Sequence, residues 1–198
     1  EASLESPSPG QNIADGTPTR VFPDMVQVLR GNTNAETGAC PTPGEGGAVT
    51  AGIRECFAEF LPTRTYLGAG DATSPERAMN FRVTARDGFV DGGGTAFDDV
   101  RLNLDRTAGP FLVTSQEEGS TVRSGGGREV TWAVNGTEDL AAQVRITMST
   151  DGGESFPYTL AQSTANDGSA RVSIPAEATD EARIKVEAVR NYFFAVNS

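Results

Sequence analysis

Four aspartates bracket a glycine-rich loop in the first half of the chain, a pattern that could bind a divalent cation. They are Asp87, Asp91, Asp98 and Asp99, within the run DGFVDGGGTAFDD. Calcium takes about six to eight oxygen ligands, and glycines let a backbone wrap closely around an ion. The run lacks the D-x-D-x-D-G pattern of an EF-hand loop. An acidic solvated turn, in which Asp98 or Asp99 accepts hydrogen bonds from backbone amides, is therefore favoured over a calcium site.

A second motif has the form S-x-D-x-G-x-S-F and comprises Ser149, Asp151, Gly153, Ser155 and Phe156. It resembles an Asp-box, a turn motif of β-hairpins in sialidases and many other β proteins. Asp151 can accept hydrogen bonds from its own turn, glycine can adopt positive φ, and Phe156 can pack underneath. A single copy predicts a stable hairpin turn, and a sugar site is the less favoured alternative.

The composition excludes most catalytic machinery. The chain has no histidine, two cysteines and a single lysine, Lys185. This removes Ser-His-Asp and Cys-His nucleophiles, histidine-based zinc hydrolases and four-thiolate zinc sites, and no phosphate-binding G-x-x-x-x-G-K-[ST] run is present. Glycoside hydrolysis by paired carboxylates needs an aromatic-lined cleft, which one tryptophan and three tyrosines do not favour. The sequence therefore predicts a protein that is not an enzyme, with calcium as its one candidate cofactor.

The charge and the cysteines indicate the compartment. A net charge of −11 argues against nucleic acid and anionic membrane surfaces as partners, and the absence of a long apolar run argues against membrane insertion. Cys40 and Cys56 lie in a region rich in Gly, Pro and Thr and are predicted to form a disulfide, with two free thiols as the alternative. We therefore expect a secreted, extracellular or cell-surface protein whose export signal was removed or lies outside this sequence.

The elements that would position these residues fall into three parts. Residues 1–20 are polar and rich in Ser, Pro and Gly, which predicts an extended arm or linker. Residues 21–106 are expected to form an irregular, disulfide-clipped β domain. Within it, a helix is predicted over residues 23–30, and helical spacing over residues 53–61 permits one or two further turns.

The acidic loop is predicted to join two strands of this first domain. Residues 79–86 (MNFRVTAR) alternate apolar and polar side chains, which is typical of a half-buried strand. Residues 96–104 (AFDDVRLNL) are the expected partner strand. A linker, DRTAGP, then leads to the second domain.

The second domain, residues 107–198, is predicted to be an immunoglobulin- or fibronectin-like sandwich. Seven short strands are expected: FLVT, TVRS, REVTWAV, AQVRITMS, FPYTL, SARVSIP and ARIKVEAV. Glycine-containing turns separate several of them. Trp132 is predicted to be a core anchor, with a ligand-stacking platform as the alternative. The fold class is thus mainly β, with two β-sandwich-like domains and one or two short helices in the first.

Several segments together resemble a known arrangement. They are RVFPDMVQVLRGNTN, EFLPTRTY, MNFRVTARDG with its GGG loop and DD, TAGPFLVTSQ, VTWAVNGT, VRITMSTDGGESFPYTL, DGSARVSIP and ARIKVEAVRNYFF. This order is similar to the region carboxy-terminal to the catalytic domain of secreted bacterial reprolysin-like zinc metallopeptidases and related surface proteins. The resemblance implies an accessory β module of an exported multi-domain parent. The catalytic H-E-x-x-H helix is not present, so no catalytic residue is implied.

These observations predict a non-catalytic accessory, spacer or binding module of a secreted bacterial metallopeptidase or cell-surface protein. The expected partners are other domains of the parent chain. One alternative is a carbohydrate- or protein-binding module in its own right. Another is a structural subunit that assembles by strand exchange through open sheet edges.

Overall fold

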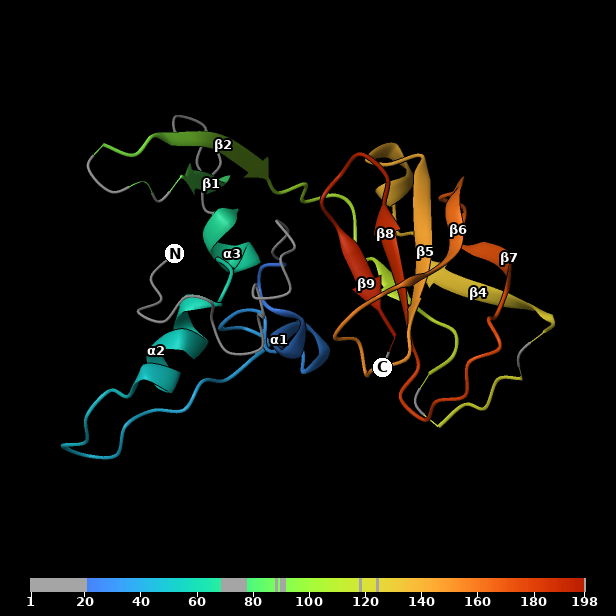
Figure 1. Cartoon of the computed structure of the whole chain (residues 1–198), viewed down its shortest axis with the longest axis horizontal. Helices are drawn as coiled ribbons and strands as arrows, with labels where there is room; N and C mark the ends of the chain where they lie inside the picture. The colour runs from blue at the N-terminus through green and yellow to red at the C-terminus, as the bar shows by residue number, and fades with distance from the viewer. Residues whose placement is uncertain are drawn as a thin grey trace.

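A computed structural model describes most of the chain and shows a mainly β protein (Figure 1). The residues it describes are 21–68, 78–87, 89, 92–117, 119–123 and 125–197, without the side chains of Glu55 and Arg86. Strands account for 34% of the described residues and helices for 12%, so the predicted mainly β class is confirmed. Residues 1–20, the expected N-terminal extended segment or linker, lie outside the described part.

Three short helices form the start of the first unit: α1 (Met25–Leu29), α2 (Ala51–Ala58) and α3 (Arg64–Leu67). Helix α1 begins later than predicted, because Asp24 is its N-cap and accepts a hydrogen bond from the Gln27 N–H at 2.9 Å. Thr63 caps α3 in the same way, at 3.1 Å from the Tyr66 nitrogen. These capping side chains satisfy backbone donors that a short helix leaves unpaired.

The remaining described part of this unit is one antiparallel hairpin of β1 (Ala78–Arg86) and β2 (Thr95–Asn103). The register runs without a bulge from Ala78 opposite Asn103 to Arg86 opposite Thr95. The expected first sandwich is therefore not what the described residues form. Two strands make only one small sheet, and helices and the Cys40–Cys56 disulfide occupy the rest of the unit.

The second unit stacks a three-stranded sheet, in the order β3-β4-β7, on a four-stranded sheet, in the order β6-β5-β8-β9 (Figure 1). The strands are β3 (Leu112–Val113), β4 (Gly127–Ala133), β5 (Gln143–Ser149), β6 (Tyr158–Ala165), β7 (Ser169–Ser173), β8 (Arg183–Ala188) and β9 (Phe194–Val196). All pairs of neighbouring strands are antiparallel. This is the sandwich architecture expected from the sequence.

The core lies between these two sheets. Its buried members alternate along the strands with more exposed residues, as a sandwich requires. They are Val130, Trp132, Val144, Ile146, Met148, Val172, Ile184 and Val186. Burying such side chains supplies the main driving force for folding.

Two details of the strand prediction were wrong. Residues 121–123 of the expected TVRS strand lie in a loop, because glycines and polar residues surround the single apolar Val122. Strand β9 was not predicted, and it adds a short edge through pairs such as Val186 with Ala195. The sandwich still has seven strands.

Candidate functional site

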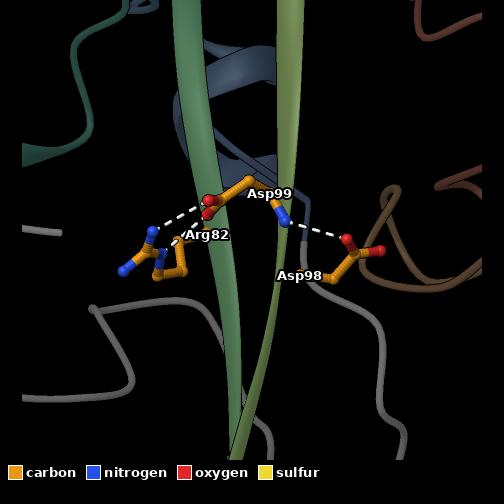
Figure 2. A network of polar contacts seen from close by, with 3 residues as sticks. All are labelled: Arg82, Asp98 and Asp99. Carbon is orange, nitrogen blue, oxygen red and sulfur yellow. Dashed lines mark hydrogen bonds and ion pairs between the residues drawn. The ribbon is translucent and has the colours of Figure 1, made fainter.

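The hairpin of β1 and β2, here called the arm, carries a charged and aromatic cluster on one face. The Arg82 guanidinium donates to both carboxylate oxygens of Asp99, at 2.6 Å and 2.8 Å (Figure 2). The same guanidinium carbon lies 4.2 Å from the centre of the Phe97 ring. The hydrogen bonds from Arg82 lower the pKa of Asp99, and the pKa of Arg82 is raised in turn. The three side chains therefore form one pre-arranged group on a solvent-exposed surface.

The opposite face of the arm is apolar apart from one carboxylate. Successive residues of a strand point to opposite faces, so Phe81, Val83 and Ala85 share a face with Ala96, Asp98 and Val100 of β2, and Asp98 lies opposite Val83. Near the base of the arm this face is partly covered, since the Phe22 and Phe81 rings meet edge to face at 5.7 Å. Towards the tip it is open: the Val83 residue is 68% exposed. Phe97, on the charged face, is 63% exposed.

The hydrogen bonds show which backbone groups of the arm point outward. Asp87 N–H donates to Gly94 O at 3.3 Å, which continues the ladder through the odd-numbered residues of β1. The backbone N–H and C=O groups of the even-numbered residues of β1, and of their partners in β2, therefore point away from the other strand. Consistent with this, the outward carbonyl of Ala78 accepts from the Asn80 side chain at 3.4 Å. The described part of the chain shows no partner strand on either outer edge.

The outer edge of β2 is capped at one amide by its own side chain. Asp98 Oδ1 accepts a hydrogen bond from the Asp99 N–H at 3.0 Å. Figure 2 shows the Asp98 carboxylate beside the outer edge of β2, while the Asp99 carboxylate points the other way, towards Arg82. A charged side chain on an edge opposes the addition of another strand. No comparable cap covers the Arg82 or Thr84 amide on the described outer edge of β1.

The structure separates three of the four aspartates considered for calcium, Asp87, Asp98 and Asp99. Asp87 accepts hydrogen bonds from the N–H groups of Phe89 and Gly94, both at 2.9 Å, and these bonds lower its pKa. Asp98 lies four residues beyond Gly94, or roughly 13 Å at the usual rise of a strand. The Asp99 side chain is hydrogen-bonded to Arg82 and lies on the opposite face of the hairpin from the Asp98 side chain. Asp91 lies outside the described residues, and the others form no group of three metal-binding side chains.

The Asp-box-like segment folds into a closed turn after β5. Asp151 Oδ1 accepts from the Ser149 hydroxyl at 2.6 Å and from the Ser155 N–H at 3.0 Å. The Ser149 oxygen in turn accepts from the Gly153 N–H at 2.8 Å. Burial alone would raise the pKa of Asp151, but these hydrogen bonds outweigh it and lower the pKa to about 2. Phe156 contacts Lys185, whose ammonium lies 4.8 Å from the ring centre.

This turn also contacts the first unit. A Cβ added at Gly153 would lie 2.9 Å from Leu29 Cδ1, so the Leu29 side chain packs directly on the glycine. Leu29 is the last residue of α1. The turn therefore stabilises the end of β5 and also contacts the first unit. The sequence motif did not predict this contact.

Trp132 is buried, with 3% of its surface exposed, and its indole Nε1 donates to Asn166 Oδ1 at 2.8 Å. The Asn166 amide donates onward to Ala141 O at 3.0 Å and to Thr137 Oγ1 at 3.3 Å. The aromatic ring is thus held inside the core by a buried polar network.

The Cys40–Cys56 disulfide is present, with the two Cα atoms 5.7 Å apart, so that prediction is confirmed. It attaches a long glycine- and proline-rich loop to α2. Among the described helices, none has the length and apolar character needed to span a bilayer. A disulfide fits an extracellular protein and does not by itself show secretion.

An open groove of about 500 Å³ lies at the end of the sandwich where β8 begins. Asn197 closes one side: its N–H donates to Ile184 O at 3.0 Å, its side-chain oxygen accepts from Ile184 N at 2.6 Å, and its amide donates to Gln116 O. The charged residues of its lining are Glu117, Glu177, Asp180, Glu181 and Arg183. None of its described lining residues is aromatic, which does not favour a sugar site.

Comparison with known protein families, with curated protein sequences and with solved structures finds no significant match for this chain. The resemblance to the accessory region of reprolysin-like metallopeptidases therefore stays a prediction.

Proposed function

We propose that this chain is a non-catalytic interaction module of a secreted or cell-surface protein. The sandwich is its scaffold, and the arm is its binding element. The observation that carries the proposal is that the arm is a two-stranded sheet whose two faces are both exposed towards the tip: Val83 is 68% exposed on one face and Phe97 63% on the other.

Such an arm is unfavourable without a partner. An isolated two-stranded hairpin is marginally stable in water, and further strands or a packed face are needed to stabilise it. Exposed apolar side chains that gather on one element often mark interaction sites. Arginine and aromatic residues are also enriched in protein interfaces, and the Arg82–Phe97 pair presents both.

The sandwich suits the role of a scaffold. Its seven strands in two antiparallel sheets, with one buried tryptophan, favour an immunoglobulin-like or fibronectin-like module. Trp132 lies on the second strand of this unit, and the unit has no cysteine, so the antibody-type arrangement around an inter-sheet disulfide does not apply. Placement in a secreted bacterial metallopeptidase or surface protein is part of the proposal.

Site-specific photo-crosslinking on the surface of the source cell tests this function. A photoreactive residue at Val83 should give discrete protein adducts. The same residue at Tyr192 is the matched control, because Tyr192 is equally exposed, at 69% against 68%, and lies on the sandwich. Adducts of the same kind and yield at both positions, or none at Val83, would contradict the proposal.

A further inference from the structure

The two edges of the arm differ, and this difference indicates what the arm binds. We propose that two copies of this chain pair through the outer edge of β1, in an antiparallel and twofold-symmetric manner. The pairing would form one continuous four-stranded sheet in the order β2-β1-β1-β2. This inference rests on the proposed function of the arm and names its partner.

The edge of β1 is the one open to pairing. The outward backbone groups of Arg82 and Thr84 have no hydrogen-bond partner among the described residues, and both side chains are exposed. On β2, by contrast, the Asp98 side chain accepts a hydrogen bond from the outward N–H of Asp99. A strand added at β2 would have to displace a charged side chain, whereas one added at β1 would not.

Charge restricts the register in which two copies of β1 can pair. A twofold axis through Val83 places Arg82 of each copy opposite Thr84 of the other, and no like charges face each other. An axis through Arg82 would place the two Arg82 residues opposite each other. An axis through Thr84 would place Arg82 opposite Arg86, again two cations. Like charges directly opposite are destabilising. An axis through Phe81 would avoid them too, but Phe81 lies at the covered base of the arm, against Phe22, so the register centred on Val83 is favoured.

This register also extends the face that carries Val83. It places Val83 opposite Val83, and Phe81 opposite Ala85, on the face that is open towards the tip. The outward-pointing Arg82 and Thr84 then form the hydrogen-bonded pairs, because they are the even-numbered residues. Twofold closure uses the β1 edge of both copies and leaves the two β2 edges exposed, where Asp98 caps the Asp99 amide and opposes growth beyond a dimer. The net charge of −11 per chain opposes association, which predicts stronger pairing as salt is raised.

Proline substitutions distinguish the edges. Thr84→Pro removes an outward N–H and leaves the β1–β2 ladder intact, since proline is tolerated where the N–H faces away from the sheet. Thr95→Pro is the matched control, a threonine with an outward N–H on β2. In sedimentation equilibrium over a concentration series, the wild type and Thr95→Pro should rise from 20.7 kDa towards twice that mass. Thr84→Pro should remain at 20.7 kDa.

Cysteine crosslinking tests the register independently of proline. Val83→Cys should form an intermolecular disulfide under mild oxidation. The two cysteines would face each other in a non-hydrogen-bonded pair, with their Cα atoms about 4.5 Å apart. Ala85→Cys lies on the same face but would face Phe81 of the second copy, and it should not crosslink to itself. Equal crosslinking of both variants would overturn the inference. So would a wild-type chain that stays monomeric at every concentration, or a dimer that Thr84→Pro leaves intact. If the chain is monomeric while Val83 still crosslinks to a different protein on cells, the dimer is wrong and the proposed function stands.

Discussion

The Asp98 carboxylate lies 3.0 Å from the Asp99 backbone nitrogen and accepts its hydrogen, on the edge of β2 that faces away from β1. This single contact makes the arm one-sided. Arg82 and Asp99 fix the charged face of the hairpin, and Asp98 closes one of its two edges. The arm can therefore add a strand at β1 without also adding one at β2, which would otherwise lead to open-ended assembly.

Removing the Asp98 cap should produce this open-ended assembly. Asp98→Val frees the Asp99 N–H and adds a β-branched residue to the edge, so light scattering should show species larger than a dimer. Asp98→Asn keeps an acceptor oxygen and is the control, for which we expect the wild-type mass. If Asp98→Val also keeps that mass, the capping role of Asp98 is contradicted.

Asp151 should stabilise the sandwich in a pH-dependent manner. Asp151→Ala removes acceptors for Ser149 and Ser155 and should lower the free energy of unfolding by about 1–2 kcal/mol at pH 7. Because the folded-state pKa is lowered to about 2, this contribution is present above the unfolded-state pKa. It is lost as the pH falls through the folded-state pKa.

Urea unfolding at pH 7 and pH 2.5 measures this effect. Glu154→Ala, in the same turn, is the control and should change little at either pH. A cost for Asp151→Ala that is equal at the two pH values would contradict the role of the charged carboxylate.

Gly153 should be less tolerant of substitution than its neighbour Gly152. Both have positive φ, +100° and +76°, so alanine is strained at either position. Only at Gly153 would the new Cβ meet Leu29, at 2.9 Å. Gly153→Ala should therefore cost about 1–3 kcal/mol more than Gly152→Ala. In a Leu29→Ala background the two substitutions should cost nearly the same, and a persistent difference would show that α1 does not pack on this turn.

Asn166 should support Trp132 in the core. Asn166→Ala leaves the indole N–H and the Ala141 carbonyl without their partner and should cost about 1–3 kcal/mol in thermal or chemical unfolding. Asn191→Ala removes an exposed hydrogen bond to Leu140 and should cost clearly less. Equal costs for the two variants would mean that the buried network contributes no more than a surface contact.

Reducing the disulfide should destabilise the first unit. The Cys40–Cys56 link closes a loop with a sequence separation of 16, for which chain entropy predicts a loss of about 3 kcal/mol. The double variant Cys40→Ser/Cys56→Ser should lose protection from proteolysis in α2 while the melting of the sandwich, followed by Trp132 fluorescence, is unchanged. Unfolding of both units together would show that they form one cooperative unit.

The sequence predicted those parts of the molecule that local patterns determine. Alternation around Val130 and Trp132 indicated the sandwich strands, and a chain with two cysteines in one loop-rich region has a single intramolecular pairing. Strand β9 was missed because three residues are too few for a period to show. The bridging role of Asn197 was missed because it depends on which strands become neighbours.

The candidate site was harder to predict for the same reason. The Arg82–Asp99 pair is separated by 17 positions in the chain, and only the register brings the two side chains together. Alternation over residues 79–86 suggested a half-buried strand, but a two-residue period does not say whether another element covers the apolar face. In the arm that face is left open at Val83.

Amide hydrogen exchange of the arm, followed residue by residue by NMR at increasing protein concentration, tests the central claim most directly. The exchange rates of the outward amides of Arg82 and Thr84 should fall as the protein concentration rises, by about fivefold when four-fifths of the chains are paired. The outward amides of Phe97 and Arg101 on β2 should not change. If the β1 amides exchange at the same rate at every concentration, or if both edges slow equally, the arm does not pair through β1.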